Sequence, residues 1–147
     1  NNIKVAFNPG YSQLKFPKET LERILNKVDI LILNKEEASQ LTIGKKFKGI
    51  TIITKGAGGV DVCEGKYLYG AMGLGLKLVD GTGAGDSFGA GFVAGFLQSD
   101  GDIISATQLG IANAAACLKE IGAKNGLLKK NEKFYKVNLK NGRTSSQ

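Results

Sequence analysis

The stretch from residue 83 to residue 97 constrains the fold most, because it is apolar and yet rich in glycine. Five glycines recur in it at helical steps: Gly83, Gly85, Gly89, Gly91 and Gly95. Each glycine inside a helix costs about 1 kcal/mol relative to alanine, so close packing against another element must compensate. Residues 103–121 form an alanine-rich candidate partner. The pattern predicts two small-residue helices that pack tightly together.

The chain before this stretch alternates strands and helices. Residues 30–33 form a continuous apolar run, which is typical of a strand buried on both faces. Other strands are predicted at residues 3–7, 50–54, 60–63, 67–69 and 76–79. Helices are predicted at residues 17–28 and 36–41. This order predicts an α/β sheet with helices on its faces, formed as one domain.

Net charge separates the end of the chain from the rest. The chain carries 20 basic and 13 acidic residues, a formal charge of +7. Residues 119–147 hold eight of the basic residues and two of the acidic ones. The basic segment at residues 125–147 is therefore expected to be a solvated helix and tail. No zinc-finger, RRM or GXXG signature accompanies the lysines, so we expect no nucleic-acid partner.

Histidine and cysteine narrow the chemistry. The chain has no histidine, which excludes Ser-His-Asp and Cys-His catalysis and the usual zinc sites. Cys63 and Cys117 have neither disulfide-framework nor zinc spacing, and both are expected to be reduced structural thiols. No apolar run reaches 18 residues and no signal peptide is visible. We expect a cytoplasmic protein without a membrane segment.

The chemical centre is predicted where a strand passes through glycines into a helix, at residues 79–88. Neither a Walker A loop nor a Rossmann GxGxxG fits this spacing. A helix N-terminus with exposed N–H groups favours anions, and Asp86 would lie in its first turn. An ionised carboxylate beside an anion site suits a general base for phosphoryl transfer to a hydroxyl. The plain alternative is a glycine turn with a capping aspartate.

Four motifs in order resemble those of the ribokinase-like (pfkB) carbohydrate kinases. Residues 80–86, Asp-Gly-Thr-Gly-Ala-Gly-Asp, are similar to the family's D-T-x-G-A-G-D, with Gly81 in place of the usual Thr. Residues 34–37 resemble its N-x-x-E motif, and residues 54–59 resemble its T-x-G-x-x-G nucleotide loop. Residues 111–116 resemble its late small-residue helix.

The resemblance implies a three-layer sandwich with a mostly parallel sheet and helices on both faces. It implies ATP-dependent phosphorylation of a hydroxymethyl group on a sugar or nucleoside. Family members are about twice as long, so residues 1–147 would be the C-terminal part of a single domain. The N-terminal half and the lid that closes over the sugar would be absent, and this chain would be inactive alone. The lid often makes the dimer, so a homodimer is also expected.

The resemblance also implies roles for individual residues. Asp86 would accept the hydroxyl proton, and an anion hole would form from the backbone of Gly83, Ala84, Gly85 and Asp86. The predicted nucleotide contacts are Thr54, Gly56, Gly59 and, beside the adenine, Asn113. The predicted metal-binding residues are Asn34 and Glu37 for Mg²⁺ through water, and Asp80 and Thr82 for a monovalent cation such as K⁺.

Other interpretations stay open from the sequence. Glu37 can be a solvated helix residue, Thr54 a plain strand former and Asn113 a helix residue without a ligand. The protein can also be a vitamin kinase of the same superfamily, acting on a pyridoxal- or hydroxymethylpyrimidine-like alcohol. A third interpretation is a non-catalytic module that keeps the nucleotide site.

Overall fold

The structure, a computed structural model, describes residues 3–41, 47–73, 75 and 81–143. Within these ranges, strands form one sheet in the order β1-β2-β3-β4-β5-β6. The strands are β1 (Ala6–Phe7), β2 (Ile30–Asn34), β3 (Ile50–Thr54), β4 (Val60–Glu64), β5 (Tyr67–Ala71) and β6 (Lys140–Arg143). The helices are α1 (Tyr11–Leu14), α2 (Lys18–Leu25), α3 (Lys35–Gln40), α4 (Ala84–Gln98) and α5 (Ile103–Cys117), with a 3₁₀ turn η1 (Gly56–Gly58). The strand predicted at residues 76–79 lies outside the described residues.

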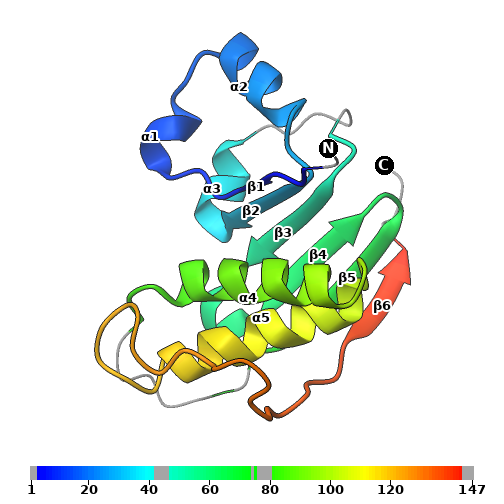
Figure 1. Ribbon diagram of the computed structural model, residues 1–147. Coiled ribbons are helices and arrows are strands. Elements are labelled where there is room, and N and C mark those ends of the chain that lie inside the picture. Colours follow the sequence, from blue (N-terminus) through cyan, green and yellow to red (C-terminus); the bar gives the residue numbers. More distant parts are fainter. Residues whose placement is uncertain (1–2, 42–46, 74, 76–80, 144–147) are drawn as a thin grey trace.

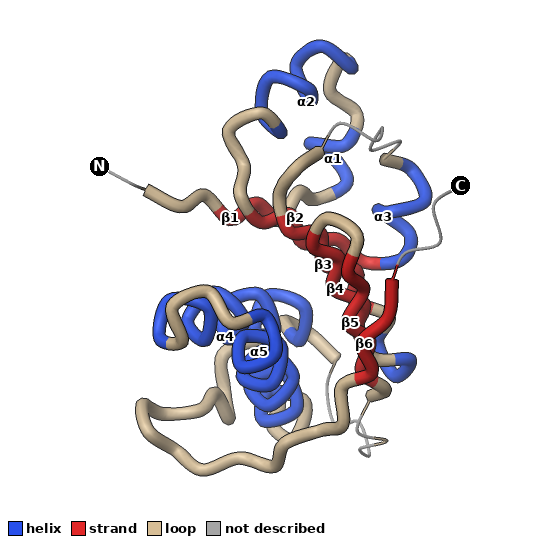
Figure 2. The backbone as a smooth tube through the Cα atoms, turned by 90° about the vertical axis from the view of Figure 1, so that its right-hand side faces the viewer, coloured by secondary structure: helices blue, strands red, loops and turns tan. Residues whose placement is uncertain are grey.

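The sheet lies between two layers of helices. Helices α4 and α5 cover one face, and α1, α2 and α3 lie on the opposite face (Figure 2). The expected α/β architecture with helices on both faces is therefore confirmed.

The sheet is mixed, which differs from the mostly parallel sheet that we expected. Strands β1, β2 and β3 run parallel. Each later pairing, from β3–β4 to β5–β6, is antiparallel. Short connections explain the β3–β4 and β4–β5 pairings, because parallel neighbours need a crossover of a dozen or more residues. Strands β4 and β5 are joined by only Gly65 and Lys66.

The core fills the space between the sheet and the α4–α5 pair. Alternate residues of β2, β3 and β4 point into it and meet Phe88 and Phe92 of α4. On β2 the intervening residues Leu31 and Leu33 are also fully buried, on the other face. The prediction of a strand buried on both faces is thus confirmed for β2.

Glycine brings α4 and α5 into close contact, as the sequence predicts. A Cβ atom on Gly91 would lie 2.8 Å from the Leu109 carbonyl oxygen, and one on Gly95 would lie 2.8 Å from the Ala106 Cα. In return, a Cβ on Gly110 would lie 2.9 Å from the Phe88 ring. Any side chain at these positions would force the helices apart. Glycine therefore allows close packing, and burial of the shared surface offsets the free-energy cost of glycine within a helix.

The C-terminal segment is not the helix and tail that we expected. Helix α5 ends at Cys117, and Gly122 has a left-handed φ of +98° that no continuing helix would allow. The chain then crosses α5 and returns to the sheet as β6, beside β5 (Figure 1). Half-buried Val137 and Leu139 pack against the core, while the lysines stay exposed. Among the residues that the structure describes, no helix is both long and apolar enough to cross a membrane.

Candidate active site

The parallel strands all end at one end of the sheet, and α4 begins at that same end (Figure 1). Asn34 and Thr54, the last residues of β2 and β3, are direct neighbours in the register. Asn8 follows β1, and its Nδ2 donates a hydrogen bond of 3.2 Å to Oδ1 of Asp86 on α4. Ligands of α/β proteins bind at this end of the sheet, outside the carboxyl ends of the strands.

Helix α4 begins at Gly83, which has a left-handed φ of +78° and supplies no side-chain cap. A Cβ on Gly83 would lie 2.6 Å from the Ala123 Cβ, so the turn packs directly against the segment after α5. A Cβ on Gly85, in contrast, would meet nothing within 4 Å. The fold therefore requires glycine at position 83, and the open space above Gly85 is room for a ligand.

Asp86 is exposed in the first turn of α4. Within the described part of the chain its side chain accepts a hydrogen bond from Asn8, 78 residues away, and from no N–H group of its own turn. The N-cap position belongs to Gly83. The capping interpretation of Asp86 is therefore wrong, and one carboxylate oxygen remains available to a ligand.

The backbone of this turn offers N–H groups to an anion. Ala84 donates weakly to the Gly81 carbonyl oxygen at 3.4 Å, and Ser87 donates to Gly83 at 2.8 Å. No carbonyl among the described residues accepts from the N–H groups of Gly85 or Asp86. These two donors lie at the positive end of the helix, where an anion is stabilised.

Asn34 and Glu37 form a capping box at the start of α3. Asn34 Oδ1 accepts from the Glu37 N–H, and Glu37 Oε2 accepts from the Asn34 N–H, both at 2.8 Å. The motif thus has a structural role that the sequence interpretation missed. Glu37 is half-buried and not simply solvated. No other described residue bonds to the Glu37 carboxylate, and the Asn34 Oδ1 keeps a second lone pair, so both can accept hydrogen bonds from water on Mg²⁺.

The loop after β3 is built on glycine. Thr54 donates its hydroxyl to the Leu33 carbonyl oxygen at 3.3 Å and so joins β3 to β2. Gly56 begins η1 with φ +55° and has open space at its Cβ position. Gly59 has φ +92°, and a Cβ there would lie 1.9 Å from the Ala71 carbonyl oxygen. Next to the loop, Lys55 pairs with Asp61 at 2.7 Å.

Asn113 and Thr82 lie where α5 contacts the α4 turn. Asn113 is buried, and its amide bonds the Ser87 carbonyl oxygen and the Leu128 N–H. The Thr82 carbonyl oxygen lies 3.7 Å from the Cys117 sulfur, and that of Ala123 lies 3.6 Å from it. Asp80, the other predicted ligand of a monovalent cation, lies outside the described residues.

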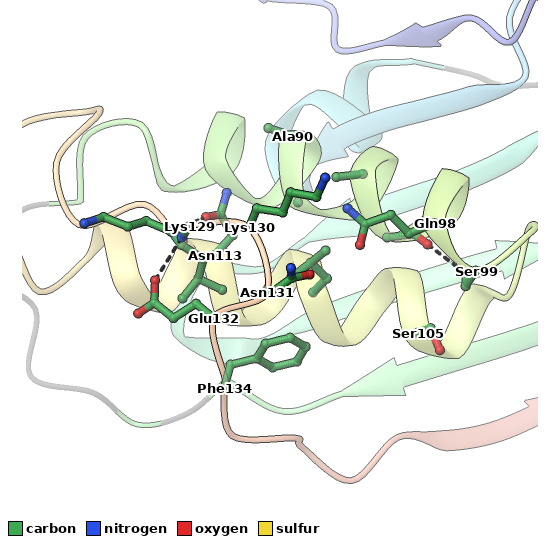
Figure 3. A pocket seen from close by; sticks show the side chains of 15 residues that line it. Ala90, Gln98, Ser99, Ser105, Asn113, Lys129, Lys130, Asn131, Glu132 and Phe134 are labelled. Carbon is green, nitrogen blue, oxygen red and sulfur yellow. Dashed lines mark hydrogen bonds between the residues drawn. The ribbon is translucent and has the colours of Figure 1, made fainter.

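A groove of about 520 Å³ runs along the outer side of α4 and α5 (Figure 3). Asn113 and Lys129 lie toward one end of it, and Ser99 and Ser105 lie toward the other. Asp86, Asn34 and Thr54 do not line this groove. Within the described ranges, no hydrogen bond joins Asp86 to Asn34, Glu37 or Thr54. Asn34 and Thr54 are thus adjacent at the carboxyl end of the sheet, and no described hydrogen bond links them to Asp86.

Asn8 is the functional candidate that sequence reasoning missed. The Asn-Pro-Gly sequence at residues 8–10 predicts only a turn after the first strand. The parallel pairing of β1 with β2 brings that turn to the end of the sheet where α4 begins. A signal existed in the position of a polar amide directly after a strand, although its partner was not evident from the sequence.

Comparison with known proteins gives the family. The pfkB family of carbohydrate kinases matches residues 1–130. The ribokinase of Lactococcus lactis subsp. lactis is 32% identical over 139 residues, which cover 90% of this chain and 44% of that protein. The chain spans about half the length of the curated relatives that it matches.

Solved structures agree with the sequence comparison. The nucleoside kinase of Methanocaldococcus jannaschii, an archaeal member of the ribokinase family, superposes with a TM-score of 0.78 at 26% identity. The match covers 86% of this chain and 45% of that one. An Escherichia coli ribokinase-family structure in complex with ATP and Mg²⁺ has the same fold, with a TM-score of 0.72 at 24% identity over 85% of this chain and 45% of its own. The fold is therefore ribokinase-like, and the chain belongs to the pfkB family of carbohydrate kinases.

Proposed function

We propose that the natural protein containing this chain transfers the γ-phosphoryl group of ATP to a hydroxymethyl group of a sugar or nucleoside. The observation that carries the proposal is the exposed carboxylate of Asp86, positioned by Asn8 at the start of α4 beside N–H groups that no described carbonyl accepts from. Family membership supports the reaction class. The relatives' names, ribokinase and nucleoside kinase, support the acceptor class.

In this reaction Asp86 is the general base. Its carboxylate takes the proton of the acceptor hydroxyl while that oxygen bonds to the γ-phosphorus and the bond to the leaving ADP breaks. Charge develops on the transferring phosphoryl oxygens. The N–H groups of Gly85 and Asp86 stabilise this charge most directly, with Gly83 and Ala84 completing the anion hole.

The nucleotide and its metal ion are assigned to the strand ends. Thr54, Gly56 and Gly59 would line the nucleotide phosphates and ribose, and Asn113 would border the adenine. When bound, Mg²⁺ neutralises phosphate charge. Asn34 and Glu37 would hold it through water, because their capping box leaves the second Glu37 carboxylate oxygen and the second lone pair of Asn34 Oδ1 as acceptors.

A monovalent cation such as K⁺ is assigned to Asp80 and Thr82. Support comes from the carbonyl oxygens of Thr82 and Ala123, which lie 3.7 and 3.6 Å from the Cys117 sulfur. Carbonyl oxygens are hard ligands that suit such a cation. The assignment belongs to the same proposal and has the same origin, the resemblance of residues 80–86 to the family motif.

The natural protein would supply what this chain does not contain. The relatives are about twice as long, so we assign the acceptor contacts and the lid to an N-terminal half. On this proposal residues 1–147 are inactive alone, the complete protein forms a homodimer through the lid, and it works in the cytoplasm.

The test is Asp86→Asn in the complete natural protein. We expect ATP-dependent phosphorylation of a panel of sugars and nucleosides to fall by about 10²–10⁴-fold, because the amide cannot accept the proton. Asp102→Asn is the matched control, since Asp102 is also an exposed aspartate at a helix start and lies at the far end of the α4–α5 pair. An Asp86→Asn variant with unchanged turnover would remove Asp86 from the role of base. A panel in which only pyridoxal-like alcohols react would indicate a vitamin kinase.

A further inference from the structure

We propose that Asn113 and Cys117 of α5 are positioning residues, which hold the first turn of α4 against the segment that follows α5 and so fix the geometry of the catalytic turn. The proposal rests on the proposed function of Asp86. It adds a role to the side chains of α5 that no motif assigns.

Asn113 joins two segments that are remote in sequence. Its Nδ2 donates to the Ser87 carbonyl oxygen at 2.8 Å, and its Oδ1 accepts from the Leu128 N–H at 3.0 Å. Ser87 directly follows Asp86 on α4. Asn113 is only 8% exposed, so loss of its amide would leave the buried Ser87 carbonyl and the half-buried Leu128 N–H without these partners.

Cys117 makes a second connection one helical turn further along α5. Its thiol is fully buried and lies 3.7 Å from the Thr82 carbonyl oxygen and 3.6 Å from that of Ala123. A thiol is a weak donor with a single hydrogen, so it donates to one of these two carbonyl oxygens at a time. The direct packing of Gly83 on Ala123 strengthens the same contact.

The two connections enclose the catalytic turn. Thr82 precedes the turn at residues 83–86, and Ser87 follows it. Gly83 caps α4 without a side chain, so the usual capping bond does not fix this helix start. The contacts from α5 take that place, and they couple the turn to residues 123–128. Because misplacement of reacting groups by about 1 Å can cost about 10²-fold in rate, this support matters for catalysis.

Gln108 offers a matched control on the same helix. It is also buried, and its side-chain amide also makes two backbone hydrogen bonds, to Val137 N and O at 2.8 and 2.6 Å. Val137 belongs to the segment that leads to β6, away from the α4 turn. Asn113→Leu and Gln108→Met thus remove equivalent pairs of bonds with similar side-chain volume, and only one pair supports the catalytic turn.

The experiment compares these variants in the complete natural protein, at a temperature where thermal unfolding shows both to be folded. For Asn113→Leu we expect kcat to fall by about 10- to 100-fold, in addition to any rise in KM for Mg-ATP from the loss of the proposed adenine contact. For Gln108→Met we expect a similar loss of Tm and a kcat within about twofold of the wild type. Backbone amide exchange at residues 83–88, followed by mass spectrometry, should accelerate only in Asn113→Leu.

Other outcomes overturn the proposal. A raised KM for Mg-ATP with unchanged kcat would mean that Asn113 acts only as an adenine contact. Equal kcat losses in both variants would mean that the bond is merely structural. If Asn113→Leu does not fold, Cys117→Ala replaces it, and unchanged kcat and exchange in that variant would contradict the proposal. A wild type without phosphorylation activity would refute the proposed function instead, and the exchange data would still decide whether Asn113 holds the turn.

Discussion

Gly83 and Gly85 stand two residues apart in the same turn, yet they are glycine for different physical reasons. Gly83 has positive φ, and a Cβ there would clash with Ala123. Gly85 is within α4, and a side chain there would meet open space. The first glycine is required by the fold, and the second leaves room for an anion.

Alanine substitution should separate these two reasons. Gly85→Ala is expected to preserve stability or raise it by up to about 1 kcal/mol, because alanine is the better helix former. It should nevertheless weaken Mg-ATP turnover, since the methyl group occupies the space above the N–H donors. Gly83→Ala is expected to destabilise the protein by more than about 1 kcal/mol, from left-handed strain and the clash together. Denaturant unfolding and kinetics on the same samples measure both effects, and unimpaired turnover in Gly85→Ala would argue against the anion hole.

The placement of single residues was predictable where a motif is contiguous. Asp86 and its glycines stand together in residues 80–86, and the strand-to-helix transition alone indicated an anion site. Asn8 was not predictable as the partner of Asp86, because that contact depends on the pairing of β1 with β2. Asn113 was proposed from the resemblance of residues 111–116 to a family motif, whereas its two backbone bonds depend on the path of residues 123–128.

Helix α5 begins with a side-chain cap. Asp102 is its N-cap, and the side chain accepts a 2.9 Å hydrogen bond from the Ser105 N–H. Hydrogen bonds with the side chain and the backbone of Ser105 hold the pKa of Asp102 below its usual value. A depressed folded-state pKa means that the ionised cap stabilises the native state above the unfolded-state pKa. That contribution disappears as pH falls through the folded-state pKa.

Substitutions of Asp102 should reveal this dependence. Asp102→Ala is expected to destabilise the protein by about 1 kcal/mol at pH 7, because the cap is lost. Asp102→Asn should keep most of the stability at pH 7, since asparagine is an equally good cap. Between about pH 5 and 3 it should lack the decrease in stability that protonation of Asp102 causes in the wild type. Urea unfolding of the three proteins from pH 7 to pH 3 checks this. Parallel pH profiles for the wild type and Asp102→Asn would show that the cap charge is irrelevant.

Elements were predictable where local pattern and tertiary environment agree. The strand predicted at residues 50–54 coincides with β3, where β-branched residues follow one another. The end of α5 and the existence of β6 were not predicted. Lys140–Arg143 has low strand propensity, and its pairing with β5 is available only after Gln108 anchors Val137 and the segment crosses α5. Tertiary contacts thus decide the course of the last 25 described residues or so, whereas propensity decides β3.

At the scale of the whole molecule, the layered arrangement was predictable from the alternation of strands and helices along the sequence. The exposed apolar surface beside β1 was not. Strand β1 forms one edge of the sheet, and no strand among the described residues pairs with its outer side. Ile3 is 76% exposed beside it, and Val5 is 39% exposed. A second groove between β1 and α2 is lined by apolar Phe7, Ile24 and Val28. Unpaired strand edges with apolar neighbours promote association between chains.

We therefore expect the 147-residue chain, produced alone, to associate reversibly as its concentration rises, in a reaction driven by the β1 edge. Ile3→Lys combined with Val5→Lys should shift the association to higher concentration, because charged lysines directly before an edge strand disfavour its pairing with another chain. Tyr135→Lys is the matched control, since Tyr135 is also an exposed apolar residue but lies on the segment that crosses α5, and it should leave association unchanged. Sedimentation velocity across a concentration series measures the effect. A wild-type chain that stays monomeric throughout, or equal shifts in all variants, would show that the β1 edge is not adhesive. The expected result, in contrast, would support β1 as the edge that pairs with the rest of the sheet in the natural protein, whose relatives are about twice as long.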